Sequence, residues 1–441
     1  MARAARLLSR SAIVFGMRLA GAALAFAIQL AIARAWGAEL FGRYLIVVAV
    51  VNLLAFFMPL GFQVTGTYFA AEYGATQNMR QLRAYARRAY IHIALSAAVL
   101  TAFSLAFGEM LSHLFPLPQG LQLPMILLAT ATAIVFVSGS LLLGMKRSVA
   151  GFVADALFRP LTMLSGIMIA GAAASADAFL TSVTLYAGYA YLAVALLHAA
   201  YMVFTLSRTP NSGDATPFES RRWWRYVMPW IAISLATDFF FDIDLIMLST
   251  MTHMKDIAVF GLSARIFALL VFATGAIFAV TIPDAIEAQH RHGHDSFYRR
   301  ITDATILAAG LSACAAVAAC FSGPVLSLFG APFAKAAWPL AILCAGLTVR
   351  LLVGPGTLML ALHDRPNAGV PPVIIGLAAL FLANIVLAER YGPVGAASAV
   401  AFAMIVWSFA QWIVTFRQTG RDVSLWPRVR ELATRPRLQQ H

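Results

Sequence analysis

Eight ionisable residues lie inside long apolar stretches of this sequence, where a charge is costly. They are four arginines and four aspartates: Arg18, Arg159, Arg265 and Arg350, with Asp155, Asp238, Asp242 and Asp244. At the centre of a bilayer each such charge costs at least about 2.5 kcal/mol, so these side chains usually face protein or a water-filled cavity. We therefore expect them either to line an internal chamber or to fix the packing of helices.

The spacing of these residues predicts a partner for one arginine and none for two others. Asp155 and Arg159 are four residues apart, so they share a helix face and can form an ion pair. Two interpretations of that pair stay open, a structural salt bridge and a part of a substrate site. Arg18 and Arg350 have no acidic neighbour in sequence, which favours a cavity role. For Arg18 the alternative is a side chain that extends toward the cytoplasmic surface.

Three of the aspartates follow one another closely in the apolar segment 226–250. Asp238 and Asp242 share a helix face, whereas Asp244 points elsewhere. Arg265, in the next apolar segment, could reach Asp242 or Asp244, because only a short turn joins the two segments. These groups are interpreted either as structural ion pairs or as candidates for a coupling-ion site. Asp238 is the first candidate for coupling, since it has no basic neighbour and a desolvated carboxyl can bind a proton.

Several arginines facing one cavity would make that cavity electropositive. In surroundings of low dielectric such a field attracts anions strongly, and the planar guanidinium suits phosphate oxygens. The sequence therefore favours an anionic, phosphate-bearing substrate. Its candidate binding residues are Arg18, Arg159, Arg265 and Arg350.

The elements that position these residues are predicted to be membrane-spanning helices. The 441 residues are 61% hydrophobic and only 12% charged, whereas soluble domains carry about 25% charged residues. Continuous apolar blocks of about 20 residues can cross a bilayer as helices, and barrel strands would alternate in polarity instead. We predict an all-α polytopic membrane protein of about 12 spans, at 11–33, 41–65, 89–108, 122–144, 150–173, 178–204, 226–250, 258–282, 304–322, 338–362, 369–388 and 393–416.

Basic residues are distributed unevenly between the predicted connections. With the N-terminus inside, the inner connections carry 23 of the 32 Lys and Arg residues and the outer ones carry five. Lys and Arg are enriched on the cytoplasmic side of membrane proteins, so both termini are predicted to be cytoplasmic. The net charge of +13 then reflects topology and contact with anionic lipids, and it does not indicate a nucleic-acid partner.

The chain is predicted to form two six-helix lobes, 1–215 and 216–441, the second with a basic cytoplasmic tail. A linker rich in Ser, Thr, Pro and Gly falls at the midpoint, at 207–220. The segment LLLGMKRSVAG at 141–151 is similar to MLALHDRPNAG at 359–369, and Phe41-Gly42 matches Phe260-Gly261 at nearly the same offset. Because six is an even number, two such halves share one orientation and leave a cavity between them.

No pattern in the sequence predicts a catalytic residue, a cofactor or a metal site. Cys314, Cys320 and Cys344 lack the spacing of metal ligands or of a disulfide framework. The histidines of QHRHGHD, at 289–295, alternate in a way that zinc could use. No cysteine accompanies them and positive charges lie nearby, so a solvated cytoplasmic loop is favoured.

Several short motifs occur in order along the chain. In the first half they are Arg34-Ala35-Trp36-Gly37, Glu39-Leu40-Phe41-Gly42-Arg43-Tyr44, Leu60-Gly61-Phe62 and Ala71-Glu72-Tyr73. In the second half they are Pro229, Asp242-Ile243-Asp244, Phe260-Gly261, Ala264-Arg265 and Pro283. With these motifs the sequence resembles polysaccharide-biosynthesis flippases, the O-antigen (Wzx-like) and exopolysaccharide translocases of the MOP superfamily. The second half lacks a tyrosine after Phe260-Gly261, where many relatives have one.

The resemblance implies two lobes around a central cavity that opens alternately to each side of the bacterial inner membrane. The implied cargo is an oligosaccharide on undecaprenyl pyrophosphate, for surface or exopolysaccharide synthesis. It also implies a polysaccharide polymerase and a chain-length regulator as partners. Related lipid II flippases have an arginine in the first helix, to which Arg18 is similar, and two further helices that are absent here.

Two alternatives from other functional classes remain. One is a multidrug or organic-cation antiporter of the same superfamily, against which four intramembrane arginines argue. The other is a membrane glycosyltransferase, polymerase or ligase, because Asp242-Ile243-Asp244 has the DxD letters that bind a metal-nucleotide sugar. That motif lies in an apolar span and no connection is long enough for a catalytic domain, so we expect no enzyme.

Overall fold

The computed structural model describes the backbone of residues 2–114, 118, 120–171, 175–210, 219–292, 294–362, 365–422, 424–427 and 430. The side chains of 2–11, 109–114, 283, 289, 290, 292, 294, 361, 362 and 366 lie outside that description. The side chains of the alternating histidines are among them, but the backbone is helical up to His292 and again from His294, so the loop predicted at 289–295 is wrong. Throughout the described ranges the regular elements are helices and no strand occurs. The all-α fold class is therefore confirmed.

Contacts divide the chain into two compact units, Met1–Ser234 and Leu235–His441. The first unit contains α1 (Ala2–Phe57), α2 (Phe62–Ala75), α3 (Met79–Leu114), α4 (Gln122–Gly144), α5 (Ser148–Val153), a π-helical turn η1 (Ala154–Phe158), α6 (Arg159–Ala170), α7 (Ala176–Arg208) and most of α8 (Ser220–Thr237). The second contains α9 (Phe240–Leu248), α10 (Met254–His292), α11 (His294–Cys320), α12 (Gly323–Leu326), η2 (Ser327–Phe329), η3 (Ala331–Ala336), α13 (Ala337–Val353), α14 (Gly356–Leu362), η4 (Pro366–Gly369) and α15 (Val370–Thr419).

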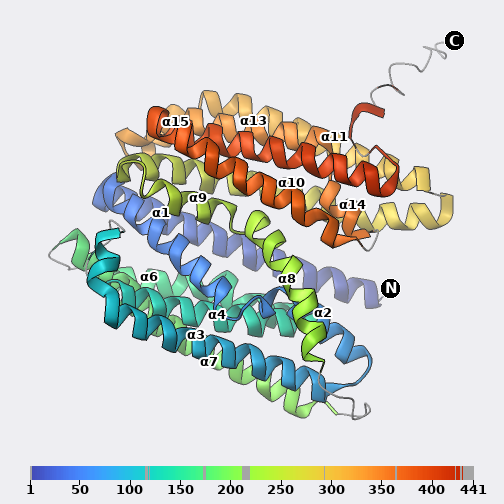
Figure 1. The fold of residues 1–441 in the computed structure, drawn as a ribbon, viewed down its shortest axis with the longest axis horizontal. Helices are drawn as coiled ribbons and strands as arrows, with labels where there is room; N and C mark the ends of the chain where they lie inside the picture. Colours follow the sequence, from blue (N-terminus) through green and yellow to red (C-terminus); the bar gives the residue numbers. More distant parts are fainter. Residues whose placement is uncertain are drawn as a thin grey trace. The chain divides into compact units, whose positions relative to one another are not determined.

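One helix forms the core of each unit. In the first, α4 packs against α1, α2, α3 and α7, and most of its residues are buried (Figure 1). In the second, α13 packs against α10, α11 and α15. Helix α4 coincides with the fourth predicted span, whereas the tenth, predicted at 338–362, breaks after Val353 and continues as α14. Phe41 and Phe260 of the predicted repeat are both completely buried.

Nine segments of the described chain are long and apolar enough to cross a membrane. Two of them, Ala12–Phe57 and Asn367–Thr419, each contain one residue with non-helical backbone, Gly37 (φ 79°) and Gly392 (φ 55°). These glycines lie between the first and second and between the eleventh and twelfth predicted spans. The structure thus shows a polytopic helical protein, while the count of twelve spans stays a prediction.

A tight turn at Gly61 joins α1 to α2 and receives α8. The glycine has φ 81°, a left-handed conformation that residues with a Cβ rarely adopt. A Cβ there would lie 2.5 Å from Cγ1 of Ile231 and 2.6 Å from Cγ1 of Val227. Backbone conformation and close packing of α8 therefore both require glycine at this position of the Leu60-Gly61-Phe62 motif.

Candidate functional site

The four arginines predicted to bind substrate are divided between the two units. Arg18 lies in α1 and Arg159 begins α6, whereas Arg265 lies in α10 and Arg350 in α13. Each unit therefore carries two of the predicted cationic groups, and their surroundings differ.

In the first unit, Asp155 and Arg159 form the ion pair that their spacing predicts. Nη1 of Arg159 lies 3.5 Å from Oδ1 of Asp155, and Nη2 of Arg159 donates a hydrogen bond to Oδ1 of Asn52 in α1. Asp155 lies within the π-helical turn and Arg159 follows it directly. Such turns are rare and occur frequently at functional sites, so the turn strengthens this pair as a candidate.

Helix α1 approaches the same turn very closely. A Cβ on Gly21 would lie 1.7 Å from the carbonyl oxygen of Ala156, so only glycine allows this contact. Three residues earlier in α1, the guanidinium of Arg18 lies 5.1 Å from the ring centroid of Phe152 in α5, within the range of a cation–π interaction. Arg18 and Arg159 thus border the same short segment, Phe152–Arg159.

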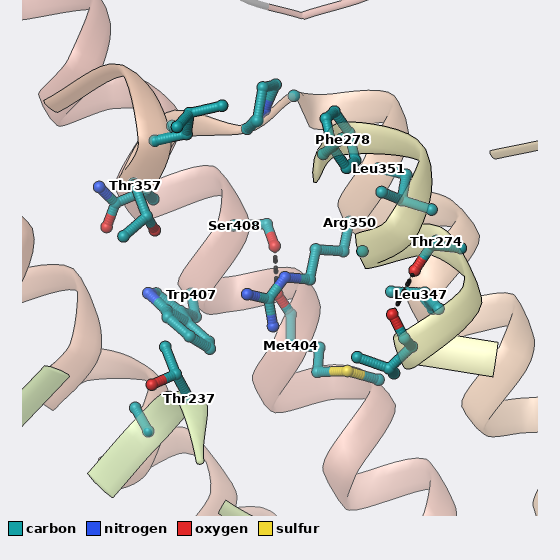
Figure 2. A pocket seen from close by; sticks show the side chains of 18 of the residues that line it. Thr237, Thr274, Phe278, Leu347, Arg350, Leu351, Thr357, Met404, Trp407 and Ser408 are labelled. Carbon is teal, nitrogen blue, oxygen red and sulfur yellow. Dashed lines mark hydrogen bonds between the residues drawn. The ribbon is translucent and has the colours of Figure 1, made fainter. Parts of the chain in front are cut away.

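In the second unit, Arg350 projects into a pocket of about 460 Å³. Figure 2 shows its guanidinium directed at Trp407 of α15, and the guanidinium carbon lies 4.2 Å from the centroid of that ring. Among the described residues Arg350 makes no ion pair, and no Asp or Glu lines the pocket. Its positive charge is therefore balanced by an aromatic face and not by a carboxylate.

The same pocket holds further polar atoms that lack hydrogen-bond partners. Nε1 of Trp407 and both polar atoms of the Gln411 side chain are buried and bond to no described group, and both residues line the pocket beside Arg350. Buried polar atoms are nearly always paired with protein or with ordered water. Three side chains that line one pocket, those of Arg350, Trp407 and Gln411, thus carry N–H donors without a hydrogen-bond partner among the described residues.

Asp244 of the second unit pairs with an amide side chain. It is completely buried and its Oδ1 accepts a hydrogen bond from Nδ2 of Asn384 in α15. Among the described residues no ion pair is found between Arg265 and Asp242 or Asp244, so a contact with Arg265 stays a prediction. The turn between α9 and α10 is short as predicted, but the buried carboxylate packs on α15, which the sequence does not reveal.

Asp238, the first sequence candidate for coupling, has different surroundings from Asp244. Asp238 is exposed and lies in the break between α8 and α9. Oδ2 of Asp244 and Oδ1 of Asn384 are both buried without a hydrogen-bond partner.

No group of three or more His, Cys, Asp or Glu side chains in the described part of the chain is placed to hold a metal ion.

A polar network at the start of α8 was missed by sequence reasoning. Arg222 lies 2.7 Å from Oε1 of Glu72 and 2.8 Å from Oε2 of Glu219. Nε1 of Trp223 donates to the hydroxyl of Tyr73, which in turn donates to Oε2 of Glu219. The hydrogen bond from Arg222 lowers the pKa of Glu219, and burial raises the pKa of Tyr73. The network ties α8 to α2 at the ends predicted to be cytoplasmic.

The network gives a structural reason for the Ala71-Glu72-Tyr73 motif. Its partners lie about 150 residues apart in sequence, so no local pattern could have joined them. The one available signal was the run of basic and aromatic residues at 221–226, which begins directly after the predicted linker.

Comparisons with known proteins place the fold among transporters. The chain aligns with the lipid II flippase MurJ in an inward closed conformation at a TM-score of 0.68 and 14% identity, covering 93% of this chain and 87% of that one. It aligns with an inward-facing multidrug resistance MATE family transporter of the MOP superfamily at a TM-score of 0.66 and 15% identity, covering 96% and 98%. A MATE protein in the bent conformation gives a TM-score of 0.58 and 16% identity, covering 96% and 93%.

No family model and no curated protein sequence matches the chain. At these low identities the structural likeness establishes the fold, which is that of MOP-type transporters.

Proposed function

We propose that this protein flips a lipid-linked oligosaccharide, carried on undecaprenyl pyrophosphate, across the bacterial inner membrane by alternating access. The observation that carries the proposal is the pocket around Arg350 in the second unit. Its guanidinium has no carboxylate partner among the described residues, and unpaired donors of Trp407 and Gln411 line the same space. Guanidinium and N–H donors in surroundings of low dielectric suit the oxygens of a phosphorylated head group.

Arg18 and the Asp155–Arg159 pair are proposed to take part from the first unit. Arg18 is held against the aromatic ring of Phe152, beside the turn that carries Asp155. Arg159 is partly neutralised by Asp155 at 3.5 Å, so a pyrophosphate would have to compete for it. Arg350 is thus the stronger candidate for binding the pyrophosphate. Arg159 would exchange Asp155 for the pyrophosphate during the transport cycle.

We place the proposed coupling to an ion gradient at Asp244. The sequence alone had favoured Asp238 for this role. Nδ2 of Asn384 donates a hydrogen bond to Oδ1 of Asp244, while Oδ2 of Asp244 is buried and accepts no hydrogen bond from a described group. A proton or a small cation bound at Asp244 would satisfy this second oxygen, because oxygen ligands suit hard cations. Asp244→Asn should leave a transport rate that no longer responds to a proton or sodium gradient, whereas Asp238→Asn should still respond.

The decisive experiment is reconstitution into vesicles that contain a fluorescent undecaprenyl-pyrophosphate-linked oligosaccharide. Arg350→Gln should lower the rate of translocation about tenfold or more, since a hydrogen bond to a charged group contributes about 1.5–3 kcal/mol. Arg390→Gln is the matched control, because it removes the same charge from an exposed site of the second unit. Translocation at the wild-type rate by Arg350→Gln would refute the role of this pocket.

A multidrug or organic-cation antiporter is the second candidate function. The observation in its favour is the aromatic lining of the same pocket, which includes Phe240, Phe241, Phe267 and Phe278. Aromatic faces bind organic cations, and MATE transporters share the fold. Efflux of cationic dyes by wild-type vesicles that do not translocate the lipid-linked sugar would establish this function in place of the flippase.

A further inference from the structure

A groove on the first unit combines Arg83 and Arg87 with an apolar wall, and neither Arg18 nor Arg159 lines it. It lies between α3 and α7, near the ends of these helices that are predicted to be cytoplasmic, and it encloses about 660 Å³. This volume is typical of a site for a small organic molecule. Arg83 and Arg87 stand at one end of the groove, and Ile91, Ala94 and Val203 line it further along.

The two arginines differ in what they bind. Nη2 of Arg83 donates hydrogen bonds to the carbonyl oxygens of Leu206 (2.9 Å) and Thr209 (3.2 Å), at the end of α7. Arg83 therefore holds the two helices together at the mouth of the groove. Arg87, one turn further along α3, is exposed and forms no hydrogen bond or ion pair with any described residue. Its five N–H donors remain available to a ligand.

Beyond Arg87 the groove becomes apolar and faces outward. Ile91 is 48% exposed and Val203 is 53% exposed on the opposite wall. The apolar surface continues along α3 through Leu95 and Val99, which are also largely exposed. In a membrane helix these side chains contact lipid tails. The groove is therefore cationic at the end with Arg83 and Arg87, and it becomes apolar further along α3, where an acyl chain can lie.

We propose that this groove binds an anionic glycerophospholipid of the inner leaflet. Its phosphate binds Arg87 beside Arg83, and one acyl chain lies along Ile91, Ala94 and Val203. Basic pockets between helices on the cytoplasmic side attract anionic head groups. A free phosphate would leave the apolar wall unused. A zwitterionic head group would find no carboxylate for its ammonium among the described residues that line the groove.

The test is native mass spectrometry of the full-length protein in detergent, with equal amounts of phosphatidylglycerol and phosphatidylethanolamine added. The wild type should retain phosphatidylglycerol preferentially. Arg87→Gln should retain about fivefold less, because one arginine near a membrane surface contributes about 1 kcal/mol to the binding of anionic lipid. Arg300→Gln, an exposed site on the second unit, is the matched charge control and should behave as the wild type.

A second pair of variants tests the apolar wall without changing charge. Ala94→Trp should fill the groove and reduce the retained phosphatidylglycerol, while Val99→Trp, on the same helix but outside the groove, should not. Equal retention of the two lipids by the wild type would overturn the proposal. Retention by Arg87→Gln or Ala94→Trp equal to that of their controls would overturn it as well. Retention of added polyprenyl phosphate in place of phosphatidylglycerol would assign the groove to a different lipid and refute it.

Discussion

Replacing Gly61 by alanine should destabilise the first unit, because two independent costs act at this one residue. The backbone there has φ 81°, and a left-handed conformation costs a residue with a Cβ about 1–2 kcal/mol. The added methyl group would also lie 2.5 Å from Cγ1 of Ile231 and 2.6 Å from Cγ1 of Val227. Overpacking of this kind costs about 1–3 kcal/mol, so the two costs together amount to about 2–5 kcal/mol.

Thermal unfolding of purified protein, followed by tryptophan fluorescence, measures this effect. For a unit of this size each kcal/mol corresponds to about 2–4 °C, so Gly61→Ala should lower the melting temperature by about 5 °C or more. Gly74→Ala is the matched control, because Gly74 lies in α2, the helix that follows the turn. An added Cβ at Gly74 meets nothing within 4 Å, and alanine is the better helix former by up to about 1 kcal/mol, so this variant should be unchanged or slightly more stable.

A double variant separates the two costs of Gly61→Ala. In an Ile231→Ala background one of the two clashes is removed while the backbone strain remains, so the cost of Gly61→Ala should become smaller but not vanish. If the melting temperature of Gly61→Ala equals that of the wild type, both the turn geometry and the packing of α8 against the turn are refuted. An unchanged cost in the Ile231→Ala background would refute the clash alone.

Two further predictions concern the network that ties α8 to α2. Because Arg222 depresses the pKa of Glu219, the stability due to this pair is complete above the ordinary carboxyl pKa of about 4.3 and is lost as pH falls through the depressed value. The melting temperature of the wild type should therefore fall more steeply below about pH 4.3 than that of Arg222→Met, and parallel curves would contradict this. Tyr73→Phe should cost about 1–3 kcal/mol, because the buried N–H of Trp223 loses its acceptor at 2.8 Å. In the same melting assay Tyr391→Phe, an exposed site, should have no effect, and equal melting of the two variants would count against the hydrogen bond.

Apolar blocks show where helices lie, but they do not show where helices break. The sequence places a connection between two spans at 34–40, whereas the structure turns there at a single residue, Gly37. The second predicted span, 41–65, ends instead at Phe57, and the chain turns before α2 begins at Phe62. Pro59 and Gly61 mark that turn, yet proline and glycine are common in membrane helices. Their effect is settled by packing that the sequence does not show.

Pairs close in sequence were predictable, and pairs distant in sequence were not. Asp155 and Arg159 pair because four residues make one helical turn. Arg350 contacts Trp407, and Asp244 contacts Asn384, through the packing of helices far apart in the chain. Hydropathy identified each charge within an apolar segment as unusual. The packing of α13 against α15 determines that Arg350 faces an aromatic ring and not a carboxylate. The identification of Arg350 as a candidate was therefore possible, while its aromatic surroundings were not predictable.

The π-helical turn at Ala154–Phe158 has a consequence for how this site can change over evolutionary time. An α-helix advances about 100° per residue, so one additional residue within a helix rotates everything that follows by that angle. The turn accommodates such an insertion without breaking the helix, and it directs Arg159 toward Asn52. Deleting the codon of Ala154 or Ala156 would restore a regular helix and turn the guanidinium of Arg159 away from Asn52. The direction of this arginine can thus be gained or lost in one genetic step that removes none of the charged residues of the site.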